Sequence, residues 1–141
     1  MILVLLIVFT GRSTPVDNSP GFVSSVADGD VLLVSAPRAT LGSASFTTAR
    51  FKTQVYVQNG RFYEAGRVEF PGTGHFLMVD TPDPGTSREA PDGSSSGSVT
   101  WRIISGGGNF QGAHGLVTGN FTSTAEGAFT DHHLYKIVLP D

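Results

Sequence analysis

A carboxylate stands where an alternating hairpin should bury apolar side chains. Residues 50–70 read RFKTQVYVQNGRFYEAGRVEF, with Asn59-Gly60 between two alternating segments. Asn-Gly supplies the two positive φ values of a type I′ turn, the strongest short hairpin signal. The register of a two-residue turn pairs Val55 with Glu64 and puts both on the apolar face. A carboxyl there must be paired, hydrogen-bonded or protonated by a raised pKa, so Glu64 is a candidate general acid or base.

Alternation near the C-terminus adds further candidates. In GAFTDHHLYKIVLP, residues 127–140, the aromatic side should face inward, which puts Asp131, His133 and Tyr135 inside and His132 outside. We expect His133 and Tyr135 to donate hydrogen bonds to negative charge that develops on a bound molecule. The walls around these groups should include Phe51, Val55, Phe62, His75, Trp101 and Phe129. Buried His and Trp residues are more often hydrogen-bonded core residues, so these roles depend on several polar groups converging on one apolar cavity.

Two other patterns fail once their spacing and context are checked. Residues 103–122 are rich in glycine, but they lack the G-x-G-x-x-G spacing and no helix follows them, so we interpret them as a turn and a crowded strand. GSSSG at 93–97 matches a nucleophile elbow around Ser95. It lies in a Ser/Gly-rich loop before a strand, whereas the elbow needs a strand before it and a helix after it.

No motif indicates a metal or another cofactor. The four histidines lack H-x-H or H-E-x-x-H spacing, so a zinc site would have to be assembled across strands, and the chain has no cysteine. We therefore predict a protein without metal or cofactor. The absence of cysteine also fits a reducing compartment and predicts a cytoplasmic protein.

The N-terminal run MILVLLIVFTG leaves an alternative for localisation. Residues 2–9 are all apolar, but no Lys or Arg precedes them and no small-residue cleavage site follows. We interpret them as a buried strand. If residues 1–9 belong to a targeting segment instead, the protein would be secreted or periplasmic.

Composition bounds the fold and the partners. The 141 residues are the size of one domain, spanning 1–141, and 39% hydrophobic residues with 18 Gly and 10 Phe are typical of a β-rich protein. The net charge is −3, and the charged residues form no long run of one sign. The sequence therefore predicts neither a nucleic-acid partner nor an anionic membrane surface as a partner.

The elements that must position these side chains are short strands. Helical periodicity is absent except for a single turn near 109–113. Two long segments, 10–29 and 81–96, are expected to be loops, and loops of this length are often mobile or act as lids. The expected strands cover residues 2–9, 30–36, 50–58, 61–70, 73–80, 97–104, 114–122 and 127–139.

About eight strands in one small domain leave a sandwich or a closed barrel, and the short connections favour an up-and-down order. The predicted fold is therefore all-β, a single small antiparallel up-and-down barrel with a central apolar cavity. A barrel of this strand number either fills its interior with side chains or holds one small ligand.

Residues 99–140 resemble the allene oxide cyclase barrel-like superfamily, in which a strand that carries Trp leads to a glycine-rich turn. The matching positions are Trp101, Gly106, Gly108, Phe110, Gly112, Ala113 and Gly115, followed by Val117-Thr118 and Asn120-Phe121-Thr122. The resemblance covers about a third of the chain. It implies a calycin-type barrel with an apolar cavity, and because such barrels are often oligomeric we expect a homo-oligomer, a dimer or a trimer. No stretch matches the catalytic residues of the plant cyclases position by position.

The resemblance and Glu64 together lead to one functional hypothesis and two alternatives. The hypothesis is a cofactor-independent isomerase or cyclase that acts on a hydrophobic small molecule, by epoxide opening or cycloaddition, inside the barrel. The first alternative is a non-catalytic, lipocalin-like carrier or sensor of an apolar ligand, with Glu64 paired to an interior partner such as His133. The second is an assembly protein with a filled core.

Overall fold

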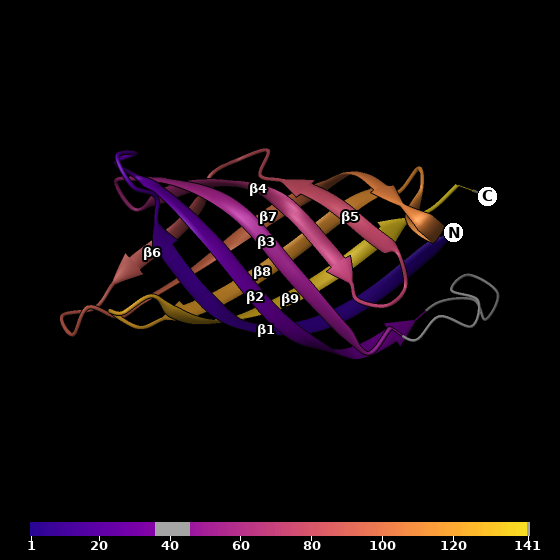
Figure 1. Cartoon of the computed structure of the whole chain (residues 1–141), viewed down its shortest axis with the longest axis horizontal. Coiled ribbons are helices and arrows are strands. Elements are labelled where there is room, and N and C mark those ends of the chain that lie inside the picture. Colours follow the sequence, from indigo (N-terminus) through magenta and orange to yellow (C-terminus); the bar gives the residue numbers. More distant parts are fainter. Residues whose placement is uncertain (36–45, 141) are drawn as a thin grey trace.

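The chain forms a closed β-barrel in the computed structural model, which describes residues 1–35 and 46–140 (Figure 1). One turn of 3-10 helix, η1 (Gly108–Phe110), accompanies the strands. The strands are β1 (Ile2–Pro15), β2 (Phe22–Ser35), β3 (Thr48–Gln58), β4 (Arg61–Phe70), β5 (His75–Asp80), β6 (Gly85–Glu89), β7 (Ser95–Gly107), β8 (His114–Ser123) and β9 (Ala128–Val138). In the described part of the chain, no helix is long and apolar enough to cross a membrane.

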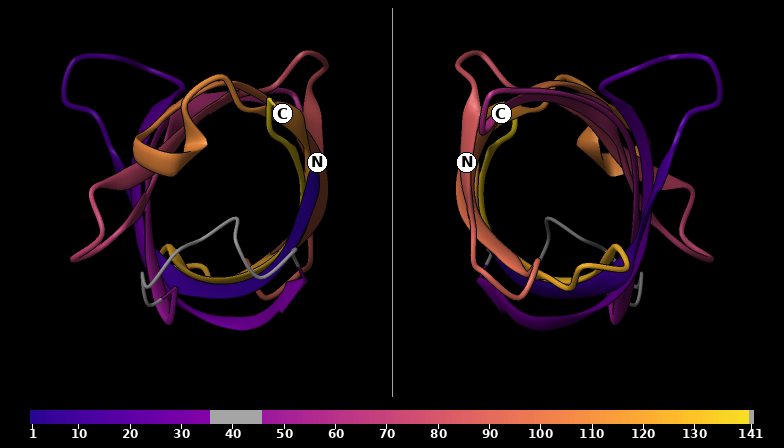
Figure 2. Two further views of the ribbon diagram at one scale, coloured as in Figure 1. Left: turned by 90° about the vertical axis from the view of Figure 1, so that its right-hand side faces the viewer. Right: turned by 90° about the vertical axis from the view of Figure 1, so that its left-hand side faces the viewer.

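The strands follow one another around the barrel in chain order. All pairings are antiparallel, β9 pairs with β1, and a β3–β4 pairing closes the ring. β5 and β6 together occupy one place, because both pair with β4 on one side and with β7 on the other. The barrel therefore has eight strand positions, and the end views show the closed ring (Figure 2). The predicted all-β, up-and-down antiparallel barrel is confirmed.

The central hairpin has the predicted register. Asn59 and Gly60 have φ values of 53° and 73°, as a type I′ turn requires. Val55 is paired with Glu64. The predicted strand over residues 2–9 is also confirmed, as part of β1, and η1 lies where a single helical turn was expected.

The predicted loop over 10–29 is wrong over most of its length. β1 continues to Pro15 and β2 already begins at Phe22, so strands occupy most of residues 10–29. Small residues permit this close pairing, since a Cβ at Gly11 would lie 2.2 Å from the carbonyl oxygen of Val26. Small and polar residues such as these are typical of a loop, but here they belong to two paired strands of the barrel wall.

Part of the second predicted loop is also strand. Within 81–96 the chain forms β6, and β7 begins at Ser95. The rest of the segment lies outside the strands: residues 81–84 connect β5 to β6, which share one position in the ring, and residues 90–94 form the turn between β6 and β7. The expected strand over 30–36 is part of β2, and its last residue, Ala36, lies outside the described residues.

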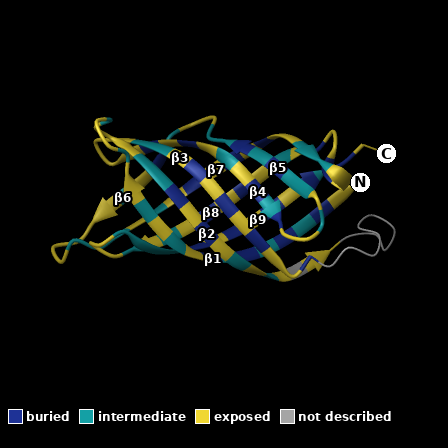
Figure 3. Cartoon of the chain, in the orientation of Figure 1, coloured by how far each residue is buried: buried dark blue, intermediate teal, exposed yellow. Residues whose placement is uncertain are grey.

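Side chains alternate between the inside and the outside of the wall, as the banding in Figure 3 shows. In β1, the inward residues Leu3, Leu5, Ile7 and Phe9 are completely buried. Burial of each such side chain stabilises the fold by about 1.5–3 kcal/mol. The half of the barrel that carries both termini is filled by these and other apolar residues, including Phe70, Phe110 and Ile137.

Candidate functional site

The opposite half of the barrel contains a cavity of about 250 Å³. Its lining residues come from eight strands and lie toward the strand ends remote from the chain termini. Apolar side chains dominate the walls, among them Val55, Val57, Phe62, Val99, Phe121 and Phe129. Five hydroxyl groups belong to the lining as well: Ser13, Ser25, Ser87, Ser95 and Ser123.

Three residues form what we call the inner end of the cavity: Phe51, Glu64 and Asp131. Phe51 separates the cavity from the filled half of the barrel, because its ring contacts Phe9, Trp101 and His133 with centroid distances of 5.0–5.6 Å. Glu64 is 8% exposed and Asp131 6%. The inner end is therefore an acidic surface on top of a packed aromatic cluster.

Glu64 lies where its strand, β4, changes from one neighbouring strand to another. β4 pairs with β6 through Phe62 and with β5 from Ala65 onward. Between these stretches Thr81 binds the Glu64 backbone: its hydroxyl accepts from the Glu64 N–H at 3.0 Å, and its own N–H donates to the Glu64 carbonyl at 2.9 Å. The Glu64 backbone is thus fixed by hydrogen bonds on this side although the regular ladder is interrupted.

The Glu64 carboxyl has the electrostatic properties of an acid–base group. Burial raises its pKa from 4.5 to about 7. The hydroxyl of Thr53, which donates a hydrogen bond to Oε2, lowers the pKa in part, while the charge of Asp131 raises it. The Trp101 indole N–H lowers it slightly, although it forms no aligned hydrogen bond. A carboxyl with this pKa is present in both protonation states at neutral pH.

Asp131, His133 and Tyr135 form a buried row on β9, because alternate residues of a strand share one face. His133 Nε2 lies 2.9 Å from Asp131 Oδ2, but its N–H direction is not aligned for a hydrogen bond, so we describe the contact as a close ion-pair approach. His133 Nδ1 lies 2.9 Å from the Tyr135 hydroxyl. In the tautomer with its proton on Nε2, the tyrosine hydroxyl donates to Nδ1 and the Nε2 proton lies close to Asp131 Oδ2. Burial, followed by the charges of Asp131 and Glu64, raises the Tyr135 pKa well above its usual value.

Trp101 lies against this row and depends on a glycine for its space. Its ring centroid is 4.6 Å from that of His133. A Cβ at Gly119 would lie 2.6 Å from the indole ring and 3.2 Å from Asp131 Oδ1. The glycine-rich stretch identified in the sequence thus makes room for the aromatic cluster behind the cavity.

The structure brings most of the sequence candidates together. Glu64 and four of the expected wall residues line the cavity: Phe51, Val55, Phe62 and Phe129. Trp101, His133 and Tyr135 are fully buried behind the inner end and are absent from the lining. These three side chains therefore lie behind the cavity surface and form no part of its lining.

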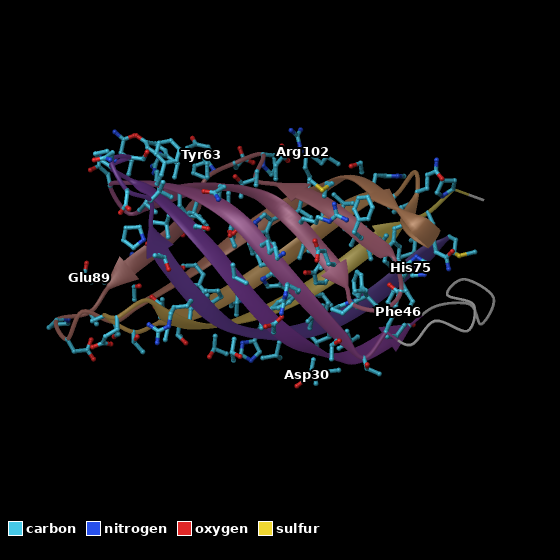
Figure 4. The ribbon with its side chains drawn as sticks, viewed as in Figure 1. Asp30, Phe46, Tyr63, His75, Glu89 and Arg102 are labelled. Carbon is cyan, nitrogen blue, oxygen red and sulfur yellow. The ribbon has the colours of Figure 1, made fainter. Side chains whose placement is uncertain are left out.

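His75 lies elsewhere. It is half-buried near the chain termini, stacked on Phe46, and its Nδ1 accepts a hydrogen bond from the Asn109 N–H at 2.9 Å (Figure 4). The expectation that His75 forms part of the cavity wall is wrong, because the inward face of β5 at this end belongs to the filled half of the barrel.

Sequence reasoning assigned no role to Asp131, Thr53 or the serine hydroxyls. Alternation did place Asp131 and Thr53 on inward faces, and an inward acid two residues before an inward histidine is a usable signal. The partner suggested for Glu64 also differs, because Thr53 bonds Glu64 while His133 contacts Asp131. Ser95, considered as a nucleophile, has its Oγ 2.7 Å from that of Ser123.

Among the described residues, no group of three or more His, Asp or Glu side chains is arranged to hold a metal ion. No protein-family model matches the chain, and no curated protein or solved structure matches it significantly. The resemblance to the allene oxide cyclase barrel-like superfamily therefore remains a prediction from the sequence pattern.

Proposed function

We propose that the protein is a cofactor-independent isomerase or cyclase that binds a hydrophobic small molecule in the cavity and moves a proton with Glu64. The observation that carries this proposal is a carboxyl with a pKa of about 7 in the lining of an apolar-walled cavity. Acid–base catalysis is most effective when the catalytic pKa lies near the working pH. A carboxyl whose pKa is strongly shifted by burial and by a specific neighbouring charge, inside a cleft, is a candidate for a functional residue.

Glu64 is suited to both halves of a proton-transfer cycle. As the carboxylate, it removes a proton from a carbon next to a carbonyl, and the electron pair of the broken C–H bond forms the double bond of an enolate. As the acid, it returns that proton to another atom of the same molecule, which completes the isomerisation. Opening of an epoxide would use the acid form first.

The remaining polar groups position Glu64 or tune its acidity. Thr53 holds Oε2 and thereby orients the carboxyl. Asp131 contributes the negative charge that helps to keep the Glu64 pKa high, and His133 and Tyr135 hold Asp131 in place. We assign His133 and Tyr135 as positioning residues, because they do not line the cavity.

The apolar walls of the cavity contribute to catalysis by confining the ligand. The cavity volume of about 250 Å³ favours a ligand that is compact or that extends through the mouth. Apolar walls that confine a flexible molecule in a reactive shape reduce the entropic part of the barrier. This role fits the cyclase that the sequence resemblance implies.

The proposal can be tested with a simple carbon acid. Phenylacetone in D₂O exchanges its benzylic protons when a base removes them, and NMR spectroscopy follows the loss of signal. We expect the protein to accelerate this exchange. The rate should rise with pH through about 7 and then level off, because the carboxylate form is the base.

The result separates an enzyme from a carrier. Binding of phenylacetone without accelerated exchange would favour the non-catalytic carrier or sensor, and accelerated exchange with a flat pH profile would contradict the role of Glu64 as the base. A protein that neither binds the ketone nor accelerates its exchange would contradict the proposal as well.

A further inference from the structure

We propose that the ligand of this cavity is an amine, with a compact apolar body and one ammonium group directed at Asp131. This inference deepens the proposed function, because it names the chemical class bound at the same site. It rests on the charge of the inner end, on the bonding of Asp131 and on the aromatic walls.

The cavity contains acids without matching bases. Glu64 and Asp131 both belong to its lining, and no Lys, Arg or His stands among the described lining residues. Every described Lys and Arg of the chain is exposed to solvent. His133 contacts Asp131 from behind the inner end, so a ligand is the group best placed to supply positive charge from the cavity side.

Asp131 has unused bonding capacity. The side chain is only 9% exposed, Oδ2 lies 2.9 Å from His133 Nε2 without an aligned hydrogen bond, and Oδ1, itself enclosed by the protein, has no hydrogen-bond partner among the described residues. Buried acceptors are usually bonded, and a carboxylate accepts several hydrogen bonds. An ammonium group carries three hydrogen-bond donors, so a bond to Asp131 leaves two donors for other acceptors of the lining.

Aromatic rings and hydroxyls complete the surroundings of a cation. Phe62 and Phe121 form an edge-to-face pair in the lining with a centroid distance of 5.7 Å, and Phe129 also lines the cavity. The faces of such rings attract cations, most strongly in desolvated sites. The serine hydroxyls provide further acceptors.

Other polar groups fit this site less well. A carboxylate ligand would bring a third negative charge beside Asp131 and Glu64, and burial of like charges together is costly. An alcohol donates only one hydrogen bond and leaves the charge of Asp131 uncompensated. The inner end therefore discriminates by charge, whereas the walls select only for size and apolar character.

Three probes with one carbon skeleton test the inference: phenethylamine, phenethyl alcohol and phenylacetate. Their dissociation constants would be measured calorimetrically at a pH of about 8, where an alkylamine remains protonated. We expect phenethylamine to bind at least about tenfold more tightly than the alcohol, and phenylacetate to bind more weakly than both. An alcohol or phenylacetate that binds as tightly as the amine, or no binding of the amine, would overturn the inference.

Variants assign the preference to Asp131. In Asp131→Asn the advantage of the amine over the alcohol should fall to about twofold or less, with the alcohol affinity unchanged. If that variant does not fold, the pair Val57→Lys and Val57→Gln replaces it, since Val57 is a partly exposed lining residue. Val57→Lys, unlike Val57→Gln, should weaken the binding of phenethylamine and strengthen the binding of phenylacetate. A preference that persists unchanged in the variants would contradict the inference.

The Glu64→Gln variant separates this inference from the proposed function. It should retain the amine preference through Asp131. If it does so while the exchange of phenylacetone also continues unchanged, the acid–base function is wrong and the ligand class is right. If exchange depends on Glu64 and the amine has no advantage, the function stands and the ligand class is wrong.

Discussion

Replacement of Glu64 by glutamine should abolish the acceleration of phenylacetone exchange while the barrel remains folded. Glutamine has nearly the same shape and can keep a hydrogen bond with Thr53, but it neither gains nor loses a proton near neutral pH. General acid–base groups contribute about 10²- to 10⁴-fold to rate, so the loss should be of that size. The measurement is the exchange rate under saturating phenylacetone, with circular dichroism as the check on folding.

Glu69→Gln is the matched control for this substitution. Glu69 lies on the same strand but faces outward, where its carboxylate is 3.1 Å from Arg67. The Glu69→Gln substitution should leave the rate of phenylacetone exchange unchanged. Equal rates for Glu64→Gln and wild-type protein would remove Glu64 from the mechanism, whatever the cavity binds.

Stability should fall with rising pH because of Glu64. The pKa of the group is about 7 in the folded protein and about 4.5 in the unfolded chain, so between these values the folded state binds more protons. The stabilising contribution is fully present below about 4.5 and is lost as the pH rises through about 7. The shift corresponds to about 3 kcal/mol in the free energy of unfolding.

Urea unfolding of wild-type protein and Glu64→Gln at a series of pH values measures this contribution. The difference between the two proteins removes the effects of other titrating groups. We expect the free energy of unfolding of Glu64→Gln to rise by about 3 kcal/mol relative to that of wild type between about pH 4.5 and 8. A difference that stays constant over this range would show that Glu64 has an ordinary pKa. The free energy of unfolding of Glu69→Gln should follow that of wild type over the same pH range.

These two predictions together describe a site maintained at a cost in stability. A variant that gains stability relative to wild type as the pH rises to 8, and yet is inactive, is the expected signature of a functional residue in an unfavourable environment. A purely structural Glu64 would show the opposite, since its removal would destabilise the protein or have no effect at any pH.

The hairpin around Glu64 could be predicted because its determinants are local. The Asn59-Gly60 turn sets the register, and alternation then decides which side chains face inward. The same logic correctly put His133 and Trp101 inside. Local patterns are sufficient wherever a strand has one apolar face and one polar face.

The encounter between Glu64 and Asp131 could not be predicted in this way. Glu64 lies on β4 and Asp131 on β9, strands that do not pair with each other, so closure of the barrel is what brings their charges together. No spacing in the sequence encodes that contact. The inward hydroxyls were missed for a related reason: Ser13 and Ser25 face each other across β1 and β2, within residues whose small and polar character suggested a loop.

The most direct test of the central claim is the titration of the Glu64 carboxyl itself. Carbon-13 NMR spectroscopy of protein labelled at the glutamate carboxyl, with the signal assigned by its absence in Glu64→Gln, follows the chemical shift as a function of pH. A midpoint of about 7 is the predicted result, and it would identify Glu64 as a group able to give and take a proton at neutral pH. A midpoint near 4.5 would contradict the account, because Glu64 would then be a permanently ionised residue.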